Sequence, residues 1–388
     1  MAQHKILFLQ FTNPAAYPPL ENSARILADM GWLVRFFGVD YLEVSAFRME
    51  PHASISVELL PARLPGWRQK LFYLSYGLGA LWRALIWRPD WIYVSDPMAS
   101  PVGLLLAWLG FRVIYHEHDA PNPVTATSCL IRWVFSCRNH LARRAQFNVL
   151  PQETRITVFQ QETRTDRPVY LVWNCPPRRE ALEGGWQRRR LSDEPLGIYY
   201  HGSINLNRVP LTLIEAAARC GVPVTIRIAG YETIGSNGAC HTLRSAAEAT
   251  GGKVTIEFAG STPHHSGLAR NMSGMHIGWI NFLDAGEDFN LTHMVGASNK
   301  AFDYLARALP LIVPETPDWV DFFVRSGTGK AVDASNPDAI ATVLRWFYEN
   351  PDESAQMGEA GRQKILAEWN YESQFGAVKE VLAQGIHR

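Results

Sequence analysis

The sequence predicts an α/β protein built from two tandem domains, each a doubly wound parallel sheet covered by helices. Three observations support this prediction. The chain has 388 residues, which is too long for a single hydrophobic core. Strand-like apolar runs alternate with helix-like segments through both halves. The alternation lapses once, between about residues 174 and 195, in a stretch rich in Pro, Gly and Arg that is typical of a linker.

The first half contains a regular series of expected elements. Residues 6–11 form a compact apolar run typical of a buried strand, and 20–30 have helical apolar spacing that stops at Gly31. The apolar segment 71–87 is interrupted by Arg83, and 102–111 is only ten residues long. A membrane span needs about 20 apolar residues, so both are expected as buried or interfacial helices. Further strands are expected at 32–37, 92–95, 112–115, 147–150 and 169–173, and a basic amphipathic helix at 129–145.

The second half repeats the alternation without repeating the sequence. Expected strands are 197–200, 224–229, 254–258, 276–280 and 310–313. Expected helices are 210–220, 241–249, 266–272, 298–308, 317–326, 337–350, 351–369 and 371–384. We therefore place an N-terminal domain at 1–177, a linker at 178–195 and a C-terminal domain at 196–370. Two such domains are expected to bind ligands in a cleft between them, at the carboxyl ends of their strands.

The composition excludes several classes of protein. A hydrophobic fraction of 47% with 19% charged residues excludes a disordered chain, a collagen and a coiled coil. The five cysteines have no metal-ligand spacing, and the first residues resemble a strand more than a secretion signal, so we expect free thiols and a cytoplasmic location. The zero net charge is a cancellation. Residues 1–190 carry 22 Lys+Arg and 15 Asp+Glu, and the remaining residues carry the reverse, which predicts different partners for the two halves.

Three segments carry candidate chemistry. In the first, Gly202 and Ser203 form the turn after a strand and Arg208 precedes a helix, so backbone N–H groups there are suited to a phosphate. An ordinary strand-to-helix turn is the alternative. In the second, Lys300 lies in the first turn of a helix that Ser298 is suited to cap, a position where a cation is unfavourable unless an anion binds. An exposed pair of Lys300 with Asp303 is the alternative.

The third segment follows an expected strand and has the sequence His116-Glu117-His118-Asp119. The two histidines are two residues apart before a proline, unlike the i, i+4 pair of a zinc-binding helix. A His–carboxylate pair for proton or phosphate chemistry is the favoured interpretation, with metal binding as a weak alternative.

Arginine and tryptophan gather in two stretches of the first half. The residues are Arg63, Trp67, Arg68, Lys70, Trp82, Arg83, Trp87 and Arg88 in one, and Arg132, Trp133, Arg138, Arg143 and Arg144 in the other. Such helices are suited to an anionic membrane surface or a lipid-linked acceptor, and equally to a solvated basic face over buried aromatic residues. No nucleic-acid partner is expected, because no recognised nucleic-acid-binding module accompanies these residues.

Taken in order, these segments resemble the large retaining glycosyltransferase family 4, whose members have the GT-B fold of two Rossmann-like domains. The resemblance runs from Lys5 to about Val381. It rests on residues 116–119, 200–203 with Arg208, 213–217, 226–230, 256–263, 298–312 and 369–371. It implies that the terminal helix, 371–388, packs back on the first domain.

The resemblance also implies roles for individual residues. Catalytic roles fall to His118, Asp119, Arg208 and Lys300, and the acceptor side includes Asn13 and His116. Donor-binding residues are Gly202, Ser203, Gly230, Tyr231, Thr262, Pro263, Glu287, Ser298, Asn299 and Asp303. Arg208 and Lys300 take the place of the metal that other transferases use, so no metal or cofactor is expected.

Two departures from the family pattern concern the sugar and the acceptor. The first of two glutamates common in the family falls on Val295, so Glu287 or a neighbouring group is expected to contact the donor sugar. The loop after the first strand, residues 12–19, has no glycine.

The implied function is transfer of a sugar, with retention, from a UDP- or GDP-linked donor to a glycan, lipid-linked or small-molecule acceptor. A nucleotide-sugar epimerase and a non-catalytic scaffold of the same fold are the alternatives.

Overall fold

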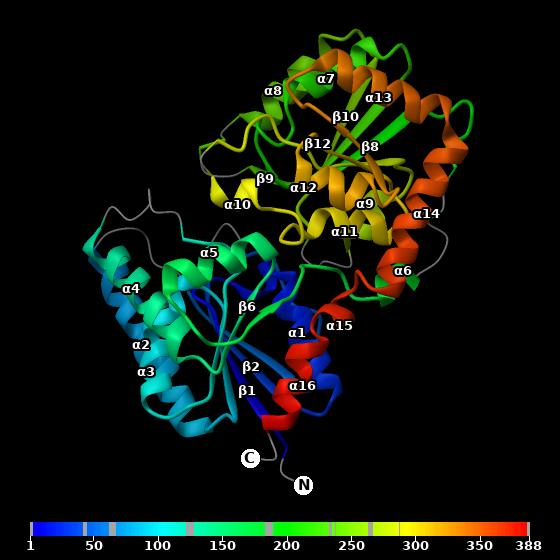
Figure 1. Ribbon diagram of the computed structural model, residues 1–388. Helices are drawn as coiled ribbons and strands as arrows, with labels where there is room; N and C mark the ends of the chain where they lie inside the picture. Colours follow the sequence, from blue (N-terminus) through cyan, green and yellow to red (C-terminus); the bar gives the residue numbers. More distant parts are fainter. Residues whose placement is uncertain are drawn as a thin grey trace. The chain divides into compact units, whose positions relative to one another are not determined.

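The computed structural model describes residues 3–41, 45–61, 67–121, 128–182, 189–232, 235–236, 238–262, 267–286 and 288–385. The chain divides into two compact units (Figure 1). The first comprises Met1–Asn174, Glu287–Ala297 and Tyr371–Arg388, and the second comprises Cys175–Gly286 and Ser298–Asn370. Each unit has a parallel sheet between helices, so the predicted fold class is confirmed.

The first unit is built on a seven-stranded parallel sheet with the strand order β3-β2-β1-β4-β5-β6-β7. Its strands are β1 (Lys5–Leu9), β2 (Leu33–Asp40), β3 (Ile55–Pro61), β4 (Trp91–Val94), β5 (Val113–His116), β6 (Phe147–Leu150) and β7 (Val169–Leu171). The edge strand β3 was not predicted. Four of its seven residues are exposed and none is buried, so it lacks the apolar run of a buried strand.

Helices cover both faces of this sheet. Along β1, Ile6 and Phe8 pack on one face while Leu7 and Leu9 pack on the other, as the two-residue period of a strand requires. The first face carries α1 (Pro18–Asp29), α15 (Tyr371–Gln374) and α16 (Gly376–Gln384), and the opposite face carries α2 (Trp67–Trp87), α3 (Ser100–Trp108), α4 (Cys129–Arg144) and α5 (Glu153–Thr163) (Figure 1). Three short helices complete the unit: η1 (Pro14–Ala16), η3 (Pro97–Ala99) and α10 (Phe289–Thr292).

The second unit is built on a six-stranded parallel sheet with the order β10-β9-β8-β11-β12-β13. Its strands are β8 (Leu196–Ile204), β9 (Val224–Glu232), β10 (Val254–Gly260), β11 (Ile277–Trp279), β12 (Leu311–Pro314) and β13 (Gly329–Val332). Its helices are α6 (Arg179–Leu182), α7 (Leu211–Arg219), α8 (Ala239–Glu248), α9 (Leu268–Met272), α11 (Asn299–Ala306), α12 (Pro317–Trp319), the π-helix η6 (Val320–Val324), α13 (Pro337–Glu349) and α14 (Pro351–Ala367).

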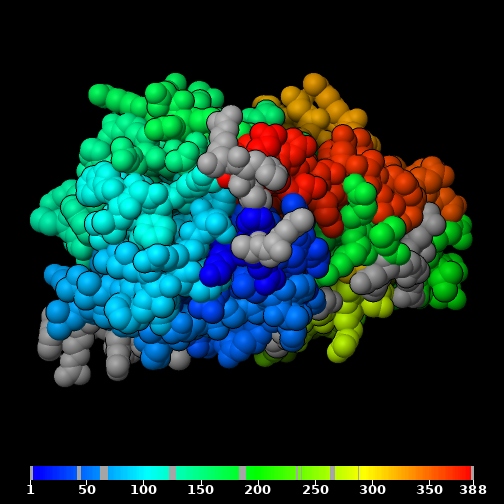
Figure 2. Space-filling view, turned by 90° about the horizontal axis from the view of Figure 1, so that it is seen from below, coloured from blue at the N-terminus to red at the C-terminus, as the bar shows by residue number. Residues whose placement is uncertain are grey.

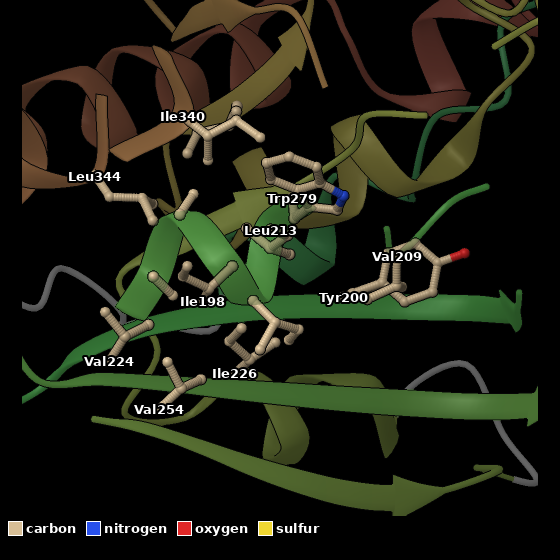
Figure 3. Close-up of a cluster of buried hydrophobic side chains, with 14 of the residues drawn as sticks. Ile198, Tyr200, Val209, Leu213, Val224, Ile226, Val254, Trp279, Ile340 and Leu344 are labelled. Carbon is tan, nitrogen blue, oxygen red and sulfur yellow. The ribbon is translucent and has the colours of Figure 1, made fainter. Parts of the chain in front are cut away.

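The core of the second unit lies between its sheet and the helices α7, α8 and α13. Figure 3 shows Ile198 and Ile226 of the sheet packed beneath Leu213 of α7, with Leu344 of α13 beside them. On the opposite face α11 approaches so closely that a Cβ on Gly278 would lie 2.2 Å from the Tyr304 ring. Only glycine fits at that position of β11.

The strand order of each sheet reverses direction beside its first strand, between β1 and β4 and between β8 and β11. Ligands of doubly wound sheets bind outside the carboxyl ends of strands at such a point. The candidate residues follow these ends, after β4 and β5 in one unit and along β8 and β9 in the other. Among the described helices, none combines the length and the apolar character that a membrane-spanning segment requires.

Candidate functional site

In the second unit, two glycines pair on neighbouring strands, and a lysine side chain lies against one of them. Gly202 of β8 pairs in register with Gly230 of β9, and both have positive φ, +125° and +143°. A Cβ on Gly230 would lie 1.9 Å from the Gly202 carbonyl oxygen, and a Cβ on Gly202 would lie 2.5 Å from Cε of Lys300. Glycine at both positions therefore keeps the backbone bare and lets the Lys300 ammonium approach it.

Lys300 is the second residue of α11, directly after the N-terminal Asn299. The N-terminus of a helix carries partial positive charge on its unpaired N–H groups. Ser298 occupies the N-cap position but makes no capping hydrogen bond, and its buried hydroxyl has no hydrogen-bond partner among the described residues. The ammonium, the helix terminus and this hydroxyl together are suited to an anion of several oxygen atoms.

Arg208 lies in a turn that follows β8. The strand continues to Ile204, so the predicted strand end at residue 200 is too early, and Gly202 and Ser203 belong to the strand itself. Asn205 Oδ1 accepts hydrogen bonds from the backbone N–H groups of Asn207 and Arg208, and Trp279 donates to the Arg208 carbonyl at 2.9 Å. These contacts hold the backbone of Arg208 in place. Burial raises the pKa of Tyr200 to about 12, and the positive charge of Arg208 opposes that rise.

Asp303 is placed inside the unit, with only 2% of its surface exposed. Its Oδ2 lies 3.2 Å from Nε2 of His201 and accepts a hydrogen bond from Asn299 Nδ2 at 3.2 Å. The alternative of an exposed pair with Lys300 is therefore wrong. His201 was not among the predicted site residues. Its backbone N–H donates a hydrogen bond to the Tyr304 hydroxyl.

Of the remaining predicted donor residues, two lie within the described part of the chain and two do not. Tyr231 is half-buried at the end of β9, and Thr262 follows β10 in contact with Gly267. Pro263 and Glu287 lie outside the described residues.

In the first unit, His118 follows the end of β5 beside Ser95, which follows the neighbouring strand β4. Its Nε2 lies 2.9 Å from the Ser95 hydroxyl, and its ring packs against His116 with the ring centres 3.9 Å apart. His118 is only 6% exposed, and burial, together with the positive charge of Arg155, lowers its pKa to about 3. The imidazole is therefore neutral over the physiological range of pH.

His116 and Asn13 are more deeply buried than an acceptor contact requires. The His116 side chain bonds to the Tyr93 hydroxyl at 2.8 Å and has no exposed surface, so its role is to support the His118 ring. Asn13 caps η1 through Ala15 N–H, and its amide nitrogen donates to the Phe47 carbonyl. Neither side chain has access to an acceptor in this structure.

The two carboxylates beside His118 have different environments. Glu117 is buried and accepts two hydrogen bonds of 2.6 Å from Arg138 of α4, which makes it a structural group that joins α4 to β5. The Asp119 side chain is 69% exposed and pairs with Arg155 of α5 at 3.6 Å. Asp119 is therefore the carboxylate of this segment that is open to solvent.

Arg155, which the sequence did not indicate, joins the His118 segment to α10. Its guanidinium is 3% exposed and donates to the carbonyls of His118, Asn290 and His293, each at 2.8 Å. The Asn290 side chain adds hydrogen bonds with both the N–H and the carbonyl of Ala120. Residues 288–297 therefore pack with the first unit, although the chain on both sides of this segment belongs to the second. No local signal predicts this contact, because the partner carbonyls are 37 to 138 residues away in the sequence.

Among the described residues, no group of three or more His, Cys, Asp or Glu side chains is arranged to hold a metal ion. The Lys300 side chain lies against Gly202, and Arg208 lies in the turn that follows the same strand. The arrangement in the second unit can bind a diphosphate and stabilise negative charge on it.

Comparisons with known proteins place both halves of the chain among glycosyltransferase families. Residues 20–155 match the family described as a glycosyl transferase 4-like domain, and residues 211–380 match the family described as glycosyl transferase-like. The search of curated proteins gives no significant match.

Similar solved structures cover nearly the whole chain. HepE from Anabaena, in complex with UDP-glucose, is 15% identical over 98% of this chain and 99% of its own, with a TM-score of 0.71. Sucrose-phosphate synthase from Thermosynechococcus elongatus is 15% identical over 98% and 99%, with a TM-score of 0.69. WaaG, a glycosyltransferase involved in lipopolysaccharide biosynthesis, is 11% identical over 97% and 99%, with a TM-score of 0.67. The two family matches and the shared fold identify the chain as a GT-B glycosyltransferase.

Proposed function

We propose that the protein transfers a sugar from a nucleoside diphosphate sugar to an acceptor hydroxyl, with retention of anomeric configuration and without a metal ion. The observation that carries this proposal is the Lys300 side chain over the bare backbone of Gly202, at the N-terminus of α11. This arrangement is suited to the diphosphate of such a donor.

We propose UDP as the nucleotide, with GDP as the second choice, because HepE shares the fold and was solved with UDP-glucose. The acceptor is proposed to be a glycan or a lipid-linked saccharide in polysaccharide biosynthesis. WaaG, which shares the fold, is involved in lipopolysaccharide biosynthesis. Peripheral contact with the anionic surface of the membrane, on its cytoplasmic side, belongs to the same proposal, since a lipid-linked acceptor is held there.

The chemistry follows from where charge develops. As the bond between the sugar C1 and the phosphate oxygen breaks, the sugar gains positive charge and the leaving diphosphate gains negative charge. Fixed cations aimed at that diphosphate stabilise the transition state more than the ground state. Lys300 and Arg208 supply those cations in this proposal, so the chain's own side chains do what a metal ion does elsewhere.

The acceptor-side residues have roles limited by their environment. His118 is neutral because burial lowers its pKa to about 3, so it acts as a hydrogen-bonding group rather than as a cation. Asp119 is exposed and oriented by Arg155, which leaves its carboxylate free to orient an acceptor hydroxyl. Asp303 is buried against His201, and this burial restricts the access of its carboxylate to a ribose.

The test is turnover of UDP-glucose and GDP-mannose by two single variants, Lys300→Ala and Arg208→Ala. Loss of one such electrostatic contact costs about 3–4 kcal/mol, so turnover at saturating donor should fall by roughly a hundredfold or more. Matched controls are Lys253→Ala and Arg325→Ala, which remove exposed cations of the same unit. Near-wild-type turnover in both site variants would contradict the proposal.

Three further measurements separate the parts of the proposal. Activity that persists in EDTA supports metal independence, whereas activity restored only by a divalent cation contradicts it. The anomeric configuration of the product, read by NMR, decides between retention and inversion. Conversion of the donor sugar without transfer to an acceptor would indicate an epimerase instead.

A further inference from the structure

The helix α2 is apolar on two opposite sides. Tyr76, Ala80 and Ala84 face the core of the first unit. On the other side, Leu71, Leu74, Leu78, Trp82, Leu85 and Ile86 are exposed, and Trp82 retains 65% of its surface. Their spacing of three or four residues places them in one stripe of about 22 Å along the helix. A surface helix of a globular protein normally presents polar residues on its outer side, so this stripe needs another explanation.

The helices beside α2 continue the same exposed apolar surface. Leu105, Trp108 and Leu109 are exposed on and just after α3, and Trp133 is exposed on α4. Figure 1 shows α2, α3 and α4 on the same face of the first sheet, and in Figure 2 their light-blue to blue-green atoms adjoin on the outside of the unit. Ten of the sixteen exposed large apolar side chains in the described part of the chain belong to this surface, which we call the α2–α4 face.

The charges that the helices α2, α3 and α4 themselves carry have one sign. The segments Trp67–Trp87, Ser100–Trp108 and Cys129–Arg144 contain no Asp or Glu, while Lys70, Arg132 and Arg144 are exposed on them. An apolar surface of this kind is typical of helices that lie in the plane of a membrane interface, and the cations are attracted to anionic lipid headgroups. We propose that the α2–α4 face docks on an anionic lipid bilayer, with its Leu and Trp side chains inserted among the headgroups and acyl chains.

The fold makes this a surface contact. The buried side of α2 is part of the core of the unit, and α2 carries Lys70 and Arg83, so the helix lies on the bilayer and does not cross it. The inference rests on the peripheral-membrane part of the proposed function and specifies which face makes the contact. Docking on a bilayer explains why an enzyme that uses a lipid-linked acceptor has a stripe of exposed leucine and tryptophan side chains about 22 Å long.

The structure also changes which residues carry the contact. Arg83 pairs with Glu58, Arg138 is buried against Glu117, and Trp87 is half-buried beneath Arg35. These members of the predicted basic and aromatic group are engaged within the unit. Arg63 lies outside the described residues, as do the side chains of Trp67 and Arg68. The exposed leucines, which the sequence analysis did not single out, make the proposed contact instead.

The test is co-sedimentation of the full-length protein with vesicles of phosphatidylcholine alone and of phosphatidylcholine with phosphatidylglycerol. The key variant is Leu78→Glu with Trp82→Glu, which places two carboxylates in the middle of the stripe. Its matched control is Met30→Glu with Leu211→Glu, which changes two exposed apolar side chains away from the α2–α4 face. A second variant, Lys70→Gln with Arg132→Gln and Arg144→Gln, removes the cations and leaves the apolar surface intact.

Wild type and control are expected to bind the anionic vesicles, and their tryptophan emission is expected to shift to shorter wavelength. The Leu78→Glu, Trp82→Glu variant should bind more weakly by about tenfold or more, because two large side chains lose their burial in lipid. The cation variant should bind anionic vesicles more weakly and lose most of the salt dependence. Equal binding of wild type and the stripe variant overturns the proposal. So does a wild-type dimer in solution that the stripe variant dissociates, if neither protein binds vesicles.

Donor binding separates this inference from the proposed transfer reaction. The stripe variant should show the same thermal shift with UDP as wild type, because the glycine–lysine site belongs to the other unit. Vesicle binding without any UDP binding would leave the docking face standing and contradict the proposed donor. UDP binding without vesicle binding would support the proposed donor and contradict the docking face.

Discussion

Replacing His118 by glutamine should make the first unit less sensitive to acid. The imidazole is buried at the end of β5, and burial with the nearby charge of Arg155 lowers its pKa from 6.5 to about 3. In the unfolded chain the same group regains its ordinary pKa. Because the unfolded chain then binds the proton more readily, the free energy of unfolding falls as the pH drops below about 6.5 and continues to fall until about pH 3.

The size of the effect follows from the two pKa values. At pH 7.5 the imidazole is neutral in both states, and its contribution to pH dependence is close to zero. At pH 5 the imidazole is protonated in the unfolded chain and neutral in the folded protein. Because pH 5 is about 1.5 units below the ordinary pKa, this difference lowers the free energy of unfolding by about 2 kcal/mol. Wild type should therefore lose about 2 kcal/mol more than His118→Gln between pH 7.5 and pH 5.

The assay is urea denaturation at the two pH values, followed by tryptophan emission, since eight of the thirteen tryptophans precede residue 175. Comparing the fall in unfolding free energy within each protein removes the pH-independent cost of the substitution. Asp96, whose pKa burial raises to about 6, titrates in the same range with the opposite sign. It is present in both proteins and cancels from the comparison.

Ser95→Ala is the matched control. It removes the hydroxyl that lies 2.9 Å from Nε2 but leaves the ring buried, so most of the acid sensitivity should remain. An equal fall in wild type and His118→Gln would refute the reasoning, because it would mean that His118 takes up a proton in the folded protein as easily as in the unfolded one.

Three other substitutions test separate parts of the structure. Gly202→Ala places a Cβ 2.5 Å from Cε of Lys300, so calorimetry should show UDP binding weakened by about tenfold, and an unchanged affinity would contradict the glycine–lysine contact. Arg155→Met leaves three carbonyls without their donor, at about 1 kcal/mol or more each, so unfolding free energy should fall by about 3 kcal/mol and amide exchange should accelerate at 290–297; unchanged exchange there would count against the contact. Arg138→Met leaves the buried Glu117 without its cationic partner, which should cost about 3–5 kcal/mol in urea denaturation; a loss below about 1 kcal/mol would show that the pair is not buried as described.

The tandem α/β architecture was predictable because parallel strands buried on both faces read as short, nearly continuous apolar runs. Residues 6–9 and 311–313 are such runs, and both are strands with almost no exposed surface. The strand β3 and the helix α5 were missed for the complementary reason. Each is largely polar or exposed along its length, so neither has a period that stands out from a loop.

The candidate site of the second unit was partly predictable because its residues lie in short local motifs. Gly202 and Lys300 each stand out within a short segment, and their contact follows once β8 and α11 pack together. The environment of Asp303 was not predictable. Its partner His201 is on another element, and a lysine three residues away suggested an exposed pair instead.

The sequence by itself determined the fold class and the residue types of the candidate site, since strand, helix and turn signals act over a few neighbouring residues. Only the tertiary structure decided which charged groups are neutralised and which apolar groups remain exposed. In the sequence, Arg155 looks like an ordinary surface residue and Glu117 like part of a reactive pair, whereas Leu78 and Trp108 look like ordinary core. Burial is set by what packs against each side chain, and those partners are tens to hundreds of residues away.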